Sequence, residues 1–512
     1  MELELKKNCF DAYEAGGELT VTQEETTETI VPDYCPDIAR IITTDGKIYI
    51  HNRELRDGKA EVTGTVRVTV LYTPEEEGGI RTLEFAMPFT AESEGRGLPD
   101  CASVLAETEI EFLETRILNP RKVFTHCKLV TRMSGWRRTP VAVCADVEAP
   151  EELHVEKRLE RQHAVVLTHV AEKDFTFSDT LTLSPGREGA AEILTSRACG
   201  TVTEAKVVGS KLIFKGVFTA SLLYRDNSGK YTSFTGELPF SQIMEVEGAV
   251  EGTEAAARLQ VTGADFQVDG GDPEGRDIAV TLYLHAAALL RQEREVSLLS
   301  DLYSTAYDLT YEASPLTLTG FAQSLTRRQT VREVLEIGVV ADSILALSAT
   351  CGAVSVSREG GTAVLRTGVS VRALYLDEGG APLVAERCVD VTCPLELPED
   401  CHVTARASCP EEVQGSLGDR GIEVRFPVEF QAEATAQVKK VCITAAKVNT
   451  DAPKELSGTP SLVLRCLGRQ ETAWDLAKRH NTTIAAILSA NQLESEADIA
   501  GDQLLLIPRK RA

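Results

Sequence analysis

A repeat of about 150 residues is the feature that most constrains this chain. Runs rich in Val, Thr, Phe and Leu end in a Leu-Tyr pair at Leu71, Leu223 and Leu374, at intervals of 152 and 151 residues. Each run is followed by a polar turn that contains glycine, and then by a second run with a proline beside an apolar residue. Because two short runs joined by such a turn are typical of a β-hairpin, the sequence predicts three copies of one β unit.

The first copy shows the alternation of a strand that is buried on one face. Its apolar residues would share that face, and the polar residues between them would face water: Val62, Val66, Val68 and Val70. Antiparallel sandwiches have this pattern, so we predict a mainly β chain of three tandem antiparallel β-sandwich-like repeats. The expected bounds are 1–156, 157–311 and 312–444 for the repeats, 445–460 for a linker and 461–512 for a terminal domain.

A short apolar segment precedes each predicted hairpin. The three segments are residues 36–42, 189–194 and 330–335, and in each the apolar residues fall at helical offsets. This spacing predicts a short amphipathic helix that covers one end of each sandwich.

The last fifty residues follow a different pattern. Thr472 precedes Asp475 by three positions, which is the capping-box signature of a helix start, and apolar residues then recur at helical spacing to about residue 488. Asn491 suits the left-handed residue that ends a helix, and Leu504 and Leu506 alternate in a closing strand. The segment therefore predicts a βααβ unit.

Residues 461–512 resemble a LysM domain, and the three repeats, the first opening on Pro36-Asp37-Ile38, resemble SPOCS domains. In this order they resemble the SipL-like spore coat morphogenetic proteins of endospore-forming bacteria, with SpoVID as a more distant comparison. The resemblance implies a non-enzymatic scaffold in the mother-cell cytoplasm, at the forespore surface. Its LysM domain would dock on the coat-basement ATPase SpoIVA, and its SPOCS repeats would promote assembly of other spore coat proteins and encasement of the forespore.

The turn before the first LysM helix bears on the choice of partner. LysM domains that bind glycans usually carry Gly-Asp-Thr there, whereas this chain has Gln470-Glu471-Thr472. A side chain replaces the glycine where a sugar would approach the backbone, which disfavours peptidoglycan. This agrees with the protein partner that the resemblance implies. A cell-wall protein that binds peptidoglycan or N-acetylglucosamine remains the alternative. The partner-binding residues expected here are Val463, Gln470, Glu471, Thr472, Trp474 and Asn491.

Trp474 has two interpretations. Tryptophan is enriched at interface hot spots, which predicts a partly exposed anchor for the partner. A tryptophan in so small a module can also belong to its core. We favour the anchor, because Leu476 and Ala477 can fill the core without it.

Charge and hydropathy exclude other classes of partner. The formal net charge of -25 repels phosphate backbones and anionic lipids, so we expect no nucleic acid. No apolar run approaches the length of a membrane span, and the first residues are charged where an export signal needs an apolar core. We therefore expect no membrane insertion and a cytoplasmic location.

No motif predicts catalysis, a cofactor or a metal. His126 and Cys127 are adjacent in a predicted strand, so they point to opposite faces and cannot form a dyad. The thiols between Cys388 and Cys409 lack the short paired spacing of zinc sites, which disfavours a metal. Ser228–Thr232 lacks the leading glycine of a phosphate-binding loop and predicts a hairpin turn. We therefore expect no enzyme.

Overall fold

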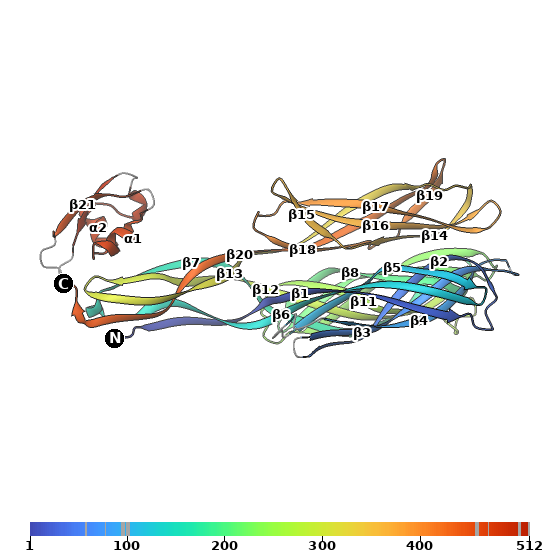
Figure 1. Ribbon diagram of the computed structural model, residues 1–512, viewed down its shortest axis with the longest axis horizontal. Coiled ribbons are helices and arrows are strands. Elements are labelled where there is room, and N and C mark those ends of the chain that lie inside the picture. Colours follow the sequence, from blue (N-terminus) through green and yellow to red (C-terminus); the bar gives the residue numbers. More distant parts are fainter. Residues whose placement is uncertain are drawn as a thin grey trace.

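The computed structural model describes residues 1–56, 59–76, 78–93, 98, 103–455, 460–468, 471–499 and 503–509. It is an elongated molecule made almost entirely of antiparallel strands, with the N-terminus and the small helical module at the same end (Figure 1). Three two-sheet units follow one another along the chain, and the helical module comes last. The predicted fold class is confirmed.

The first sandwich pairs two three-stranded sheets, ordered β2-β3-β4 and β1-β6-β5. The first and last strands are long neighbours, so each sandwich begins and ends in the same sheet. The strand bounds are β1 (Glu4–Ile30), β2 (Ile38–Arg56), β3 (Lys59–Pro74), β4 (Arg81–Glu92), β5 (Ser103–Asn119) and β6 (Lys122–Glu148).

The second sandwich repeats this plan, with sheets ordered β10-β9-β8 and β11-β12-β7. A 3-10 turn at Glu151–Leu153 connects it to the first. Its strand bounds are β7 (Val155–Thr182), β8 (Ala190–Val208), β9 (Lys211–Asp226), β10 (Tyr231–Glu245), β11 (Glu254–Val268) and β12 (Asp277–Ser304).

The third sandwich keeps the plan but divides two of its strands. One sheet has the order β14-β16-β15 with β17 also on β16, and the other has β13-β20-β18 with β19 also on β20. The bounds are β13 (Tyr307–Leu335), β14 (Ala341–Cys351), β15 (Ser355–Glu359), β16 (Thr362–Asp377), β17 (Pro382–Leu395), β18 (His402–Ser408), β19 (Gln414–Gly418) and β20 (Gly421–Pro453).

The three predicted hairpins are confirmed as β3–β4, β9–β10 and β16–β17. The alternating valines of β3 are buried as predicted, with Val66, Val68 and Val70 fully enclosed. The opposite face differs from the prediction near its end, because Thr69 and Leu71 are also buried. Neighbouring sandwiches cover that face there, as the packing described below shows.

The three predicted short helices are wrong. Residues 38–42 and 190–194 lie in β2 and β8, and residues 330–335 lie in β13. In β2 the register shifts after Ile38, after Ile41 and again after Ile50, and β8 has three shifts at the equivalent places. The first two shifts fall within the predicted helix. Each bulge adds a residue to one strand, so apolar residues that face one side are spaced by three instead of two. Paired bulges therefore imitate a helical period.

The same pair of bulges in the third sandwich follows Ala341 and Ile344. The segment that corresponds to residues 38–42 is thus 341–345 and not 330–335. The structure also moves the expected boundaries: β13 begins at Tyr307 and pairs with β20, which continues to Pro453. Residues 445–453, expected in a linker, are strand, and residues 456–459 lie outside the described chain.

The three sandwiches pack around a common axis. Leu71, Leu223 and Leu374, the leucines that mark the repeat in the sequence, meet in one apolar cluster. The second bulge of β8 and β14 places Leu194 and Leu345 in the same cluster. Equivalent positions from all three repeats thus converge, so the arrangement is pseudo-threefold.

Beyond the sandwiches, the first and last strands of each repeat extend together toward the N-terminal end of the molecule (Figure 1). We call this part the stalk. It comprises the parts of β1, β6, β7, β12, β13 and β20 that surround a second apolar cluster. Its buried members include Leu3, Val143, Val147, Leu298, Leu302, Ile443 and Val448.

Candidate binding sites: the terminal module and the axial cavity

The terminal module folds as the predicted βααβ unit. Strands β21 (Leu462–Cys466) and β22 (Leu504–Pro508) pair, and between them lie α1 (Ala473–Arg479), α2 (Ile484–Asn491) and a 3-10 turn at Glu496–Asp498. The predicted capping box is present: Asp475 N donates to Thr472 Oγ1 at 3.3 Å, and Thr472 N donates to Asp475 Oδ2 at 2.9 Å. Thr472 is therefore occupied at the start of α1.

Val463 and Asn491, two more of the six expected partner residues, also support the module internally. Val463 points inward and packs against the module core. Asn491 Nδ2 donates to the carbonyls of Ile487 and Leu506, and its Oδ1 accepts from Leu506 N. This side chain joins α2 to β22. The prediction that Asn491 is left-handed is wrong: it is the last residue of α2, and Gln492 follows with φ 57°.

The turn before α1 is organised by Glu471. Its carboxylate accepts from Arg465 at 3.1 Å and from Arg479 at 2.5 Å, and Gly468 N donates to it as well. The hydrogen bond from Arg479 is the largest of the contributions that lower the pKa of Glu471. Gln470 lies outside the described residues, so its expected role stays a prediction.

Trp474 is not the partly exposed residue that we expected, because its side chain is 5% exposed. Its ring meets the ring of Tyr303 on β12 edge to face, with centroids 5.0 Å apart. Tyr303 is itself a buried member of the module core. The aromatic surface that we assigned to a partner is therefore covered by the stalk of the same chain.

Polar contacts hold the module in this position. Asp301 on β12 accepts hydrogen bonds from Trp474 Nε1 at 2.7 Å and from Lys478 Nζ at 2.6 Å. Tyr303 Oη donates to Thr482 O at 2.7 Å, and Lys454 Nζ donates to Asn481 Oδ1 at 2.8 Å. Burial raises the pKa of Asp301, but the hydrogen bonds from Lys478 and Trp474 outweigh it and hold the pKa below its ordinary value.

The outer face of the module's two-stranded sheet is exposed and apolar. Leu462, Leu464 and Leu504 are 51%, 60% and 57% exposed, and the pairing of β21 with β22 places them on the side opposite Val463. Val463 and Leu464 point to opposite faces of β21, and we had assigned Val463 rather than Leu464 to the partner; Leu462 and Leu504 were not predicted to bind it. The sequence feature that indicates this face is the alternation of Leu462 and Leu464 around the inward Val463. We call them the leucine face.

Comparison with protein families decides the identity of these units. The family described as SipL, SPOCS domain matches residues 37–118 and 190–269, and the LysM domain family matches residues 469–508. The chain carries SPOCS and LysM domains. The resemblance to SipL-like proteins is thereby confirmed. No curated protein matches the chain significantly. The two SPOCS matches lie within the first two sandwiches, over β2–β5 and β8–β11. The third sandwich shares their strand plan and paired bulges.

The other candidate sites of the sequence have structural explanations. His126 and the buried Cys127 lie on opposite faces of β6, as predicted, and burial raises the pKa of Cys127 to about 11. Residues 227–230 form the β9–β10 turn, with Gly229 at φ 88°. Among the described residues no group of three or more His, Cys, Asp or Glu side chains could hold a metal ion. In that same part of the chain, no helix is long and apolar enough to cross a membrane.

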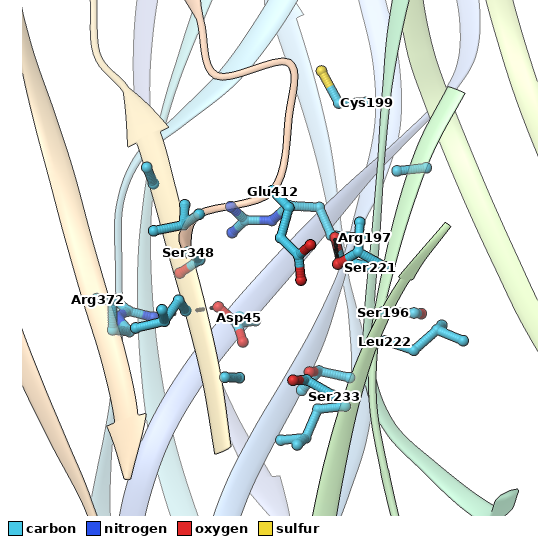
Figure 2. Close-up of a pocket in the computed structure, with 18 of the residues that line it drawn as sticks. Asp45, Ser196, Arg197, Cys199, Ser221, Leu222, Ser233, Ser348, Arg372 and Glu412 are labelled. Atoms are coloured by element: carbon cyan, nitrogen blue, oxygen red, sulfur yellow. Dashed lines mark hydrogen bonds and ion pairs between the residues drawn. The ribbon is translucent and has the colours of Figure 1, made fainter. Parts of the chain in front are cut away.

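A cavity of about 620 Å³ lies where the three SPOCS-type sandwiches meet. Each sandwich contributes one basic residue to its lining: Lys47, Arg197 and Arg372. Arg372 donates to Thr43 at 2.9 Å and pairs with Asp45 at 3.3 Å, and Lys47 Nζ donates to Ser196 Oγ at 2.6 Å. Figure 2 shows Asp45, Arg197 and Arg372 among the side chains around the cavity.

Equivalent positions around the axis carry unlike side chains. Strand pairing sets Asp45 opposite Thr69 in the first sandwich, Arg197 opposite Ser221 in the second and Ser348 opposite Arg372 in the third. The acid of one repeat can therefore pair with the base of another across the axis.

Proposed function

We propose that this chain is a non-enzymatic scaffold for assembly of the spore coat. Its LysM module would dock on a SpoIVA-like ATPase, and its SPOCS domains would bring other coat proteins to the forespore surface and promote encasement. The SPOCS and LysM domains indicate a sporulation-related protein built from binding domains. The docking partner, the encasement role and the location in the mother cell at the forespore surface are our proposal.

The leucine face is the observation that carries the proposal. Three large leucines exposed together on a small domain form an apolar patch of the kind that marks protein interaction sites. The turn where a sugar would approach has Glu471 engaged by two arginines, Arg465 and Arg479. Both features favour a protein surface over a glycan.

Peptidoglycan binding is the second candidate function. The LysM match supports it, because this type of domain is capable of binding peptidoglycan. It would use the turn around Glu471 rather than the leucine face, so the two functions depend on different residues.

The test compares full-length Leu464→Asp with the unchanged chain in pull-downs on purified SpoIVA and on insoluble peptidoglycan. Leu118→Asp is the matched control, because Leu118 is also an exposed leucine on a strand, 52% exposed on β5. We expect Leu464→Asp to reduce the amount of SpoIVA that is recovered at least tenfold. Leu118→Asp should recover as much SpoIVA as the unchanged chain. Retention of the unchanged chain on peptidoglycan alone would contradict the scaffold proposal.

The avidity of the assembly follows from one chain carrying both kinds of domain. A module that is bound at the forespore surface raises the effective concentration of the attached SPOCS domains there.

A fluorescent fusion followed through sporulation tests the location. Signal that stays uniform in the mother cell would contradict it.

A further inference from the structure

Three cysteines from two different sandwiches gather at the axial cavity. Cys199 lies on β8, Cys351 is the last residue of β14, and Cys409 lies in the connection between β18 and β19. Cys351 Sγ and Cys409 Sγ are 3.3 Å apart. Cys199 and Cys409 line the cavity, and Figure 2 shows Cys199 there.

We propose that Cys351 and Cys409 form a reversible dithiol–disulfide site, oxidised by a small organic disulfide that enters the axial cavity. A disulfide requires an S–S distance of about 2.05 Å, so the two sulfurs must approach by roughly 1.3 Å. Cys409 stands in a connection without strand pairing, so a small backbone adjustment there can close this distance without breaking a ladder.

The positions of the two thiols assign their order of reaction. Cys409 lines the cavity, whereas Cys351 is not part of its lining, so an entering reagent meets Cys409 first. The hydrogen bond from Cys351, with help from Arg197, lowers the pKa of Cys409, while the pKa of Cys351 is raised by its bond to Cys409 and by burial. The thiolate is the attacking form of a cysteine, and both observations give that role to Cys409.

The chemistry is two thiol–disulfide exchanges. The Cys409 thiolate attacks one sulfur of the reagent RS–SR, the S–S bond breaks, and one RS⁻ leaves with its electron pair and takes up a proton as RSH. Cys351 then loses its proton to solvent and attacks the Cys409 sulfur, and the second RS⁻ leaves. The two cysteines are oxidised, and one RS–SR is reduced to two RSH.

The new bond would join the two sheets of the third sandwich. Cys351 ends a strand of the β14-β16-β15 sheet, and Cys409 lies between two strands that pair with β20 in the other sheet. The bond would also hold residues 409–413 in place beside the cavity that they line. Oxidation should therefore stiffen the third sandwich and the wall of the axial cavity.

A second pair of neighbouring thiols serves as an internal comparison. Cys442 Sγ lies 3.7 Å from Cys144 O in the stalk, and both cysteines are buried in the apolar cluster there. Neither of them is among the residues that line the axial cavity. The proposal therefore predicts that this pair stays reduced while Cys351 and Cys409 react.

The experiment uses full-length protein in which Cys9, Cys101, Cys388 and Cys466 are replaced by Ser. Three of these are exposed, and Cys101 lies outside the described residues. The reduced chain is treated with hydroxyethyl disulfide and analysed by intact mass and by peptide mapping without reduction. We expect the loss of two thiols per chain, a 351–409 linked peptide, and reversal by dithiothreitol. The thermal midpoint should rise by several degrees on oxidation.

Cys351→Ser in the same background should stop at the mixed disulfide and add one reagent group at Cys409. If that variant does not fold, alkylation of Cys351 and of Cys409 is compared before and after oxidation in the chain that keeps both cysteines. Both rates should fall to zero together, whereas a mixed disulfide at Cys409 would leave Cys351 reactive. A linked peptide at 199–409 or 144–442, or no linked peptide, would overturn the assignment. None of these results depends on the identity of the LysM partner.

Discussion

Trp474 Nε1 donates a hydrogen bond to Asp301 Oδ2 at 2.7 Å, from the LysM module to a stalk strand 173 residues earlier in the chain. The other oxygen of the same carboxylate accepts from Lys478 Nζ and from Tyr311 Oη. One carboxylate on β12 thus accepts hydrogen bonds from the module and from β13. The LysM domain is held by specific polar contacts rather than tethered freely.

Replacing Asp301 with Ala should release the module from the stalk. Trp474 and Lys478 lose a charged acceptor in a half-buried site, a loss of about 2 kcal/mol. In a Trp136→Phe background the emission of Trp474 should shift to the red, and amides of α1 should exchange faster. Asp342→Ala removes an exposed carboxylate elsewhere and should change neither signal. An unchanged emission spectrum in Asp301→Ala would show that the aromatic contact with Tyr303 is sufficient.

Trp474→Ala should unfold the module, because the side chain is buried against Tyr303. Truncation of a buried tryptophan costs about 3–5 kcal/mol, which is a large share of the stability of a small domain. Trp474→Phe keeps an aromatic ring against Tyr303 and loses the hydrogen bond to Asp301 and part of the ring volume, so it should retain the helical signal of α1 and α2. Circular dichroism and hydrogen exchange of residues 473–491 measure both variants. A fully folded Trp474→Ala module would contradict the buried role.

Glu172 should make the stability of the chain fall as the pH rises. Burial raises its pKa from 4.5 to about 7, Arg53 opposes this shift and Asp174 adds to it. The folded state therefore binds the proton more tightly than the unfolded state. Stability is highest below pH 4.5 for this group, declines between pH 4.5 and 7, and remains reduced above, by at most about 3 kcal/mol.

Glu172→Gln tests this pH dependence. The variant should be more stable than the unchanged chain at pH 8 and equal to it at pH 4.5, as measured by denaturant unfolding monitored at both pH values. Glu160→Gln, which removes another carboxylate from the same strand, is the control. Equal stabilisation at both pH values would exclude Glu172 as the titrating group.

Leu223→Ala should loosen the packing of the three sandwiches on their axis. The side chain is 2% exposed and shares a cluster with Leu71 and Leu374, and removal of a buried leucine to Ala costs about 2–5 kcal/mol. Hydrogen exchange should increase at β3, β9 and β16 together, because all three strands contribute to the cluster. Val441→Ala, at an exposed position of β20, should leave these strands unchanged. An increase confined to β9 would argue against a shared cluster.

The repeat, the hairpins and the LysM capping box could be predicted from the sequence because each depends on neighbouring residues. The alternation in β3 and the Thr472–Asp475 pair are local signals. The bulges after Ile38 and Ile41 were misread as a helix because an inserted residue lengthens the apolar period toward that of a helix. Only the pairing with β3 distinguishes a bulged strand from a helix here, and the sequence of the segment alone does not indicate that pairing.

Long-range contacts account for the remaining differences. Nothing near Trp474 in the sequence indicates that Asp301 and Tyr303 cover it. The thiols of Cys351 and Cys409 are 58 positions apart, and no short spacing connects them. The burial of Thr69 and Leu71 likewise depends on neighbouring repeats. The first feature arises from packing of the LysM module on the stalk and the second from packing of the two sheets of the third sandwich. Only the third arises from the packing of repeats on one axis.

The unlike residues around that axis bear on how an interior shared by three repeats can evolve. Three identical subunits would bring three copies of one side chain to the same level, and like charges would repel there. Fusion into one polypeptide lets the sequence of each repeat change independently, so that Asp45 of the first repeat faces Arg372 of the third. A covalent trimer can therefore contain a polarised, asymmetric interior that a homotrimer with strict threefold symmetry could not form.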